Sequence, residues 1–402
     1  MAAGTISSAP TGMDVRAMST LSVGHAVTDL SQGAVPALLP FLIDQRGYSY
    51  AAASALVLAS TLSSSVIQPL FGLWSDRASL ALLVPIGVLL SGLGIGVVGV
   101  APSYELTFLA VLVSGLGVAA FHPEGSRHAS RVAGARRATG MSRFAVGGNI
   151  GFALGPVLTT PLVLLFGLPG TLALILPGLL AGAVLLHETP RMKRQTATAS
   201  ARAVEADTRS EPSEWGPFAL LGGVIALRTF FYFGLSTFVP LYFIVELGAS
   251  EALGNAALSA LLAAGVAGTL IGGPLADRYG RRKFLMTTTA ASAPLLLLFL
   301  VSGRGPALVF VALIGAFTVA NFSITVVMSQ EYLPSRVGLA SGVSLGLAIG
   351  LGGVGASAAG LVADAYGVRT AIEVLGVLPL LGVALILTLP RHTRHERLER
   401  SL

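Results

Sequence analysis

The 402-residue sequence has no cysteine and few charged residues. The absence of cysteine excludes a disulfide framework and a thiolate metal site. Charged residues make up 11% of the chain, whereas a soluble globular domain carries about 25%. So few charges do not cover a water-facing surface, and most of the surface is therefore expected to face lipid. A hydrophobic content of 53% and a mean hydropathy of +0.80 also indicate an integral membrane protein.

Two further absences narrow the class of function. The sequence has no Gly-x-x-x-x-Gly-Lys-Ser/Thr loop and no soluble segment long enough to bind a nucleotide, which argues against an ATP-driven pump. His122, Glu124 and His128 are the one candidate metal set, and their spacing does not suit a helix, so no metal, cofactor or enzymatic activity is expected. The net charge of +6 does not indicate nucleic acid, because the basic residues gather in alternate loops.

Long apolar segments dominate what is present. A membrane-spanning helix needs about 20 mostly apolar residues. Twelve segments meet this requirement, six in each half of the chain, and they predict an all-α membrane protein. The twelve segments are 18–42, 51–74, 80–100, 105–122, 141–165, 168–187, 218–245, 254–275, 284–302, 307–330, 338–362 and 370–389.

The distribution of Lys and Arg predicts the orientation of these helices. With both termini in the cytoplasm, the inner segments hold 21 basic residues and the outer loops hold three, Arg46, Arg304 and Arg369. This asymmetry follows the positive-inside rule and supports this orientation. The expected location is the inner (plasma) membrane. The expected organisation is a tail at 1–17, a six-helix lobe at 18–188, a flexible cytoplasmic linker at 189–216, a second six-helix lobe at 217–390 and a tail at 391–402.

A short loop signature occurs once in each half. Residues 273–283 read Gly-Pro-Leu-Ala-Asp-Arg-Tyr-Gly-Arg-Arg-Lys, and residues 72–77 read Gly-Leu-Trp-Ser-Asp-Arg. Asp277 minus Asp76 is 201, half the length of the chain. Two similar six-helix halves are typical of a two-lobed secondary transporter.

Twelve helices, a long central loop and this repeated signature together resemble the major facilitator superfamily over essentially the whole chain. The second loop matches the superfamily pattern Gly-x-Leu-Ala-Asp-Arg-x-Gly-Arg-Arg nearly completely, whereas the first loop lacks the trailing Gly-Arg-Arg. A carboxylate there can pair with Arg and with a helix N-terminus, which predicts a latch that breaks when the protein opens; a plain positive-inside anchor is the alternative. The latch residues are Asp76, Arg77, Asp277, Arg278 and Arg281.

A second motif, Gly151-Phe-Ala-Leu-Gly155-Pro156, resembles the Gly-x-x-x-Gly-Pro of proton-coupled drug antiporters in this superfamily. Generic helix packing through small residues is the alternative interpretation. Four segments also look like the fosmidomycin-resistance subfamily: helix 1 from His25, residues 121–127, residues 143–156 and residues 321–336. This resemblance implies export of a small drug or metabolite in exchange for protons.

Ionisable groups inside a bilayer are unfavourable by about 2.5–3.5 kcal/mol each on insertion scales, so each one points to a function. His25, Asp29 and Gln32 share one helix face at i, i+4 and i+7. We expect Asp29 to exchange a proton with His25 as relay or hydrogen-bond partner. A buried pair that only fixes helix packing is the alternative.

Arg228 lies equally deep in the seventh helix. Arg228 is expected either to pair with Asp29 across the lobes or to bind an anionic group of the substrate directly, since the guanidinium suits bidentate recognition. The alternative is an Arg whose side chain extends to the membrane interface. Gln32, Asn149, Asn321 and Tyr232 are the other expected substrate-binding residues, although the asparagines could equally bridge helices.

Charged residues at the inner ends of the fourth and tenth helices are expected to form a further gate. A cluster of solvated charges at the helix ends is nearly as good an interpretation. These residues are Glu124, Arg127, Arg143, Glu331 and Arg336.

The sequence therefore predicts proton-coupled export of a small molecule by alternating access. Uptake of a small organic anion or metabolite by symport is the first alternative, and a non-transporting membrane receptor is the second. The expected partners are the substrate, protons and the lipid bilayer, and the protein is expected to be a monomer.

Overall fold

The computed structural model is helical, and no strand occurs in the part of the chain that it describes. Eleven helices in this part are long and apolar enough to cross a membrane, and a shorter apolar helix, Tyr50–Val66, makes a twelfth pass. The prediction of an all-α, twelve-helix membrane protein is confirmed. The described residues are 13–68, 70–71, 80–134, 137–200 and 213–390.

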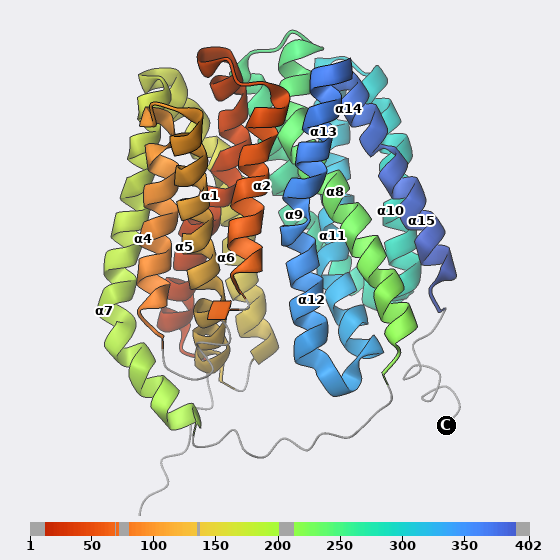
Figure 1. Ribbon diagram of the computed structural model, residues 1–402. Helices are drawn as coiled ribbons and strands as arrows, with labels where there is room; N and C mark the ends of the chain where they lie inside the picture. Colours follow the sequence, from red (N-terminus) through yellow and green to blue (C-terminus); the bar gives the residue numbers. More distant parts are fainter. Residues whose placement is uncertain (1–12, 69, 72–79, 135–136, 201–212, 391–402) are drawn as a thin grey trace, which may run out of the picture.

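The helices form two bundles that lie side by side in Figure 1. The first lobe consists of α1 Val15–Arg46, α2 Tyr50–Val66, α4 Leu83–Val97 with η1 Val98–Val100, α5 Tyr104–Val132, α6 Arg137–Phe166, and η2 Leu168–Leu174 with α7 Ile175–Ser200. The second lobe consists of α8 Trp215–Val245, α9 Glu251–Tyr279, α10 Arg281–Val301, α11 Arg304–Tyr332, η3 Pro334–Arg336 with α12 Val337–Gly350 and α13 Gly352–Tyr366, and α14 Val368–Leu375 with α15 Val377–Thr388.

The same turn chemistry recurs in both lobes at a fixed distance along the chain. Gly47 ends the turn after α1 with φ 66°, and Gly248 does so after α8 with φ 60°. Ser49 and Ser250 then cap the next helix through their hydroxyl oxygens. Each of these pairs is separated by 201 residues, as the loop signatures are. Glycine suits the left-handed turn and serine suits the N-cap. The two lobes therefore repeat the same turn and cap structure as well as the same sequence pattern.

The lobes meet at the end of the bundle opposite to the starts of α1 and α8, which we call the distal end (Figure 1). There the Asp364 carboxylate accepts hydrogen bonds from the backbone N–H groups of Tyr50, at 2.7 Å, and Ala51, at 3.0 Å. These groups open α2, so Asp364 of one lobe caps a helix of the other. The Asn255 amide donates to the carbonyl of Ala37 at 3.0 Å, again across the lobes.

Two features differ from the predicted boundaries. The α7 helix continues to Ser200, so the first part of the segment expected to be a flexible linker is helical. The eleventh span is interrupted near Leu351, where α12 gives way to α13. Three glycines lie around this break, at 350, 352 and 353, and glycine weakens a helix interior by about 1 kcal/mol relative to alanine.

Candidate functional site

The clearest cluster of ionisable groups lies in the first lobe around Asp29 of α1. Nε2 of His25, one turn earlier on α1, lies 3.2 Å from a carboxylate oxygen of Asp29. Nε2 of His122, on α5, lies 3.3 Å from the other oxygen. The two Nε2 atoms are 3.0 Å apart. We call these three residues the His–Asp–His cluster; its members are buried or expose less than a fifth of their side chains.

Backbone carbonyls fix how the two imidazoles present their nitrogens. Nδ1 of His25 lies 2.8 Å from the carbonyl oxygen of Phe144, and Nδ1 of His122 lies 3.0 Å from that of Val118. A carbonyl oxygen accepts and never donates, so both Nδ1 atoms carry the hydrogen. In the neutral imidazoles, both Nε2 atoms are then bare acceptors that face each other and Asp29.

Aromatic rings hold His25 in place. Its ring stacks on Phe144 with centroids 4.1 Å apart and lies 5.8 Å from Phe121. These ring contacts fix the plane of the imidazole. Gln68 of α2 adds a polar neighbour, with its amide nitrogen 3.5 Å from Nδ1 of His122.

Glycines on α6 allow this helix to lie against α1 at the level of the cluster. A Cβ at Gly151 would collide with the backbone of Ala26, and one at Gly155 with the backbone of Gly33. A Cβ at Gly148 would come within 2.5 Å of Nε2 of His25 and 2.6 Å of Oδ2 of Asp29. The predicted Gly-x-x-x-Gly-Pro segment, including Pro156, therefore lies in the helix that covers the cluster.

The chemistry of the cluster follows from its atoms. Two bare imidazole nitrogens and a carboxylate repel one another unless at least one proton, or a metal ion, lies among them. His25, Asp29 and His122 are the three residues in the described part of the chain that could share a metal ion. The same arrangement can also hold one proton, as an imidazolium between the partners, or two, with each ring donating to Asp29.

Arg228 is not joined to Asp29 in this structure, and the expected cross-lobe pair is absent from the described residues. Its guanidinium carbon lies 5.4 Å from the ring centre of Phe322 on α11, and Nη2 contacts the Thr229 hydroxyl at 3.5 Å. Phe322 minus Phe121 is 201, so equivalent aromatic rings support an imidazole in one lobe and a guanidinium in the other. Arg228 and the expected residue Asn321 line a cavity inside the second lobe.

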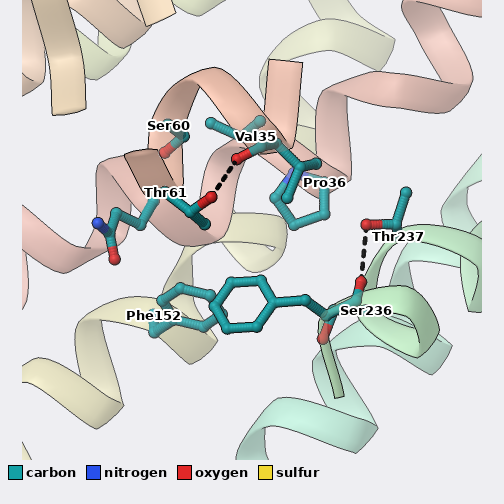
Figure 2. A pocket seen from close by; sticks show the side chains of 10 residues that line it. Val35, Pro36, Ser60, Thr61, Phe152, Ser236 and Thr237 are labelled. Carbon is teal, nitrogen blue, oxygen red and sulfur yellow. Dashed lines mark hydrogen bonds between the residues drawn. The ribbon is translucent and has the colours of Figure 1, made fainter. Parts of the chain in front are cut away.

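A different cavity lies between the lobes. Figure 2 shows Val35 and Pro36 of α1, Thr61 of α2 and Phe152 of α6, from the first lobe, around the cavity together with Ser236 and Thr237 of α8, from the second. Its lining also includes Gln32, whose amide nitrogen is buried without a hydrogen-bond partner in the described chain.

Two other expected substrate residues do not line these cavities. Asn149 is half-buried on α6. Tyr232 is half-buried on α8 and packs against the hydrophobic cores of both lobes.

The expected gate residues of the second lobe are joined within that lobe. Arg281 forms an ion pair with Glu331 of α11 and lies 3.6 Å from Asp277. The guanidinium of Arg278 lies over Tyr279, and that of Arg336 over Trp215 at the start of α8. The contacts of Arg281 join α9, α10 and α11, and the contact of Arg336 joins η3 to the start of α8.

The corresponding residues of the first lobe are only partly described. Glu124 is fully buried, 3.7 Å from Nε of Arg127 and 3.5 Å from Nε2 of His128, all on α5. Arg143 is exposed. Asp76 and Arg77, the first copy of the loop signature, lie outside the described residues.

Comparison with known proteins identifies the family. The profile of the Major Facilitator Superfamily matches residues 21–262 and 221–401, which together span nearly the whole chain. The chain belongs to the major facilitator superfamily. It is therefore a multi-pass membrane transporter and not an enzyme.

Relatives within the superfamily align over most of the chain. The Fosmidomycin resistance protein of Escherichia coli is 30% identical over 371 residues, which cover 92% of this chain and 91% of that protein. YfnC of Bacillus subtilis, an uncharacterised transporter, is 30% identical over 374 residues, 90% of each chain.

Solved structures share the fold. A bacterial homologue of the human lysosomal transporter Spinster, in an inward-facing and occupied conformation, superimposes with a TM-score of 0.76 at 15% identity and covers 97% of this chain and 98% of its own. A variant of the nucleoside transporter NupG superimposes with a TM-score of 0.70 at 14% identity, over 93% of this chain and 99% of its own. At such identities the likeness extends to the major facilitator fold alone.

One member of the site escaped the sequence interpretation. The sequence pattern groups His122 with Glu124 and His128 at the end of the fourth helix, but the structure places it against Asp29. A usable signal was present, because His122 and His25 both lie in segments that resemble the fosmidomycin-resistance subfamily.

Proposed function

We propose that this transporter exports a small drug or metabolite, fosmidomycin-like in chemistry, in exchange for protons. Alternating access is the working mechanism for the superfamily fold, with the two lobes rocking about a midplane site. The relative named for fosmidomycin resistance supports export, as does the glycine-lined contact of α6 with α1. The proposed location is the inner (plasma) membrane, with a monomer whose termini are both cytoplasmic.

The convergence of three acceptors in the His–Asp–His cluster carries the proposal. Without a proton, two lone pairs 3.0 Å apart stand beside a carboxylate, and the arrangement is repulsive. With a proton, Nε2 of one ring donates to the other ring or to Asp29, and hydrogen bonds to charged groups stabilise by about 1.5–3 kcal/mol. Protonation therefore decides whether α1 and α5 are drawn together at this point.

The cluster is linked to the substrate cavity through α1. Gln32 lies three residues beyond Asp29, on the same helix face, and lines the cavity between the lobes. A proton that arrives or leaves at Asp29 shifts the segment of α1 that carries Gln32. Substrate and proton thus act on the same helix, α1, from two neighbouring positions. Exchange requires such coupling between the binding of the substrate and the binding of the proton.

Proton flux in proteoliposomes tests the proposal. A pH-sensitive dye inside the vesicles reports flux when fosmidomycin, or a panel of phosphonates, organic anions and cationic drugs, is added. Asp29→Asn should abolish substrate-triggered flux, and His122→Gln should reduce it at least tenfold, because each removes a member of the cluster. His187→Gln is the matched control, since His187 is an exposed histidine of the same lobe.

The outcomes separate the alternatives. Opposed movement of substrate and proton supports exchange, whereas movement of both in the same direction would establish symport. Full flux in Asp29→Asn would remove the cluster from coupling. Flux that a chelator abolishes and Zn²⁺ restores would assign the cluster to a metal ion. No proton flux with any compound, in protein that is shown to be folded, would favour the receptor alternative.

A further inference from the structure

The second lobe contains a cavity whose lining carries an unpaired cation. The cavity lies between α8, α10, α11 and α15. Arg228 lines it, and Nε of its guanidinium is buried without a hydrogen-bond partner in the described chain. Its hydrogen bond to Thr229 is long, at 3.5 Å. A buried guanidinium without a counter-charge is unfavourable, and the ring of Phe322 offsets this only in part.

The neighbouring polar groups of this cavity can donate hydrogen bonds. The Thr318 hydroxyl is buried and has no hydrogen-bond partner among the described residues. The Asn321 side-chain oxygen accepts from the Thr288 hydroxyl at 2.8 Å, so its amide nitrogen is turned the other way, toward Thr289 at 3.4 Å. Thr318, Asn321 and Thr289 all line the cavity, and its described lining holds no acidic side chain.

We propose that this cavity is an oxyanion site, which binds the carboxylate, phosphate or phosphonate group of a ligand as the missing counter-charge of Arg228. The guanidinium supplies charge and paired donors, while Thr318 and Asn321 supply neutral ones. The cavity between the lobes differs in kind, because its lining has hydroxyl, amide and aromatic groups but no charged side chain. The inference rests on the proposed function only if the oxyanion belongs to the transported molecule, since binding itself requires neither protons nor transport.

Thermal unfolding of the purified full-length protein, in detergent at fixed pH without added anions, tests the site directly. Methylphosphonate, phosphate and acetate should each raise the Tm by a few degrees at saturating concentration, and a neutral amide should not. Phosphatidylglycerol in mixed micelles forms a separate arm, because a lipid headgroup offers the same oxyanion.

Three variants locate the binding. Arg228→Gln should abolish the rise in Tm while leaving the Tm without anion unchanged or higher, because the substitution removes an uncompensated buried charge. Thr318→Val should weaken binding about tenfold, as expected for one hydrogen bond to a charged group. Thr325→Val is the control on the same helix, since Thr325 is buried outside the cavity and its hydroxyl donates to the carbonyl of Phe322.

A rise with the free anions that both cavity variants weaken supports a site for a soluble oxyanion. A rise with the lipid alone, lost in Arg228→Gln, supports the site and assigns it to a headgroup. A rise that survives in Arg228→Gln would overturn the proposal, and so would wild-type protein that responds to neither source. A loss of basal Tm in Arg228→Gln without any anion response would assign Arg228 to packing. None of these results depends on proton flux, so the site and the exchange mechanism fail separately.

Discussion

Gly148→Ala is the sharpest test of the His–Asp–His cluster, because it adds one methyl group and removes no polar atom. The new Cβ would lie 2.5 Å from Nε2 of His25 and 2.6 Å from Oδ2 of Asp29, whereas ordinary contact begins at 3.4 Å. The two atoms must therefore retreat by about 0.9 Å and 0.8 Å, the differences between these values. The contacts to Asp29 start at separations of 3.2 and 3.3 Å, and we expect this displacement to lengthen at least one of them beyond hydrogen-bond range.

The expected size of the effect follows from that contact. A hydrogen bond to a charged group is worth about 1.5–3 kcal/mol, which corresponds to a fall of about 10–100-fold in coupled transport. Helix propensity works in the opposite direction, since alanine is favoured over glycine by about 1 kcal/mol in a helix interior. Gly148→Ala should therefore yield folded protein that has lost coupling.

The assay is substrate-triggered proton flux in proteoliposomes, with monodispersity in detergent as the check on folding. Gly222→Ala on α8 is the matched control, because its Cβ would meet only Leu347 at 3.6 Å, an ordinary contact distance. Wild-type flux in folded Gly148→Ala would refute the assignment of the proton site. Equal losses in both variants would show that the effect is not specific to the cluster.

Two further outcomes are expected elsewhere in the chain. Asp364→Ala removes the carboxylate that caps α2 across the lobes. Such a cap stabilises by about 1 kcal/mol, so the distal end should open about fivefold more often in the variant. The chain has no cysteine, so Ser54→Cys, buried in the wild type, can report this opening as faster labelling by a maleimide added to the purified protein; an unchanged rate would contradict it. Glu331→Gln breaks the half-exposed ion pair with Arg281 and should lower the free energy of unfolding by about 1 kcal/mol. The variant should therefore have a lower Tm than the wild type, and the difference in Tm should shrink in high salt. A difference in Tm that does not depend on salt would point to packing instead.

The helices and the repeat could be predicted because each depends on local physics. Hydropathy marks a span regardless of its neighbours, and a glycine followed two residues later by a serine predicts a turn and a cap at both 47–49 and 248–250. The face shared by His25 and Asp29 also follows from spacing alone. The helical part of the expected linker was missed because its polarity was read as disorder, although Ala, Gln and Arg after Pro190 are good helix formers.

The remainder of the site depends on how helices pack, which one sequence does not specify. His122 joins Asp29 only because α5 crosses α1 at that level. Arg228 lies at the depth expected for a partner of Asp29, but depth does not give direction, and its side chain is turned toward Phe322 within its own lobe. Equal depth on symmetry-related helices is thus a weak reason to infer a contact.

The equivalent rings of Phe121 and Phe322 have a consequence for how the two halves share their task. Each ring supports a basic group, but an imidazole can change its charge within the range of pH that a cell experiences, whereas a guanidinium keeps its charge throughout. Under the proposed exchange mechanism, the first half of the molecule would carry the group that takes up and releases the proton at this level, and the second half would carry a constant charge. The two copies of the repeat thus place basic groups of different chemistry against equivalent rings.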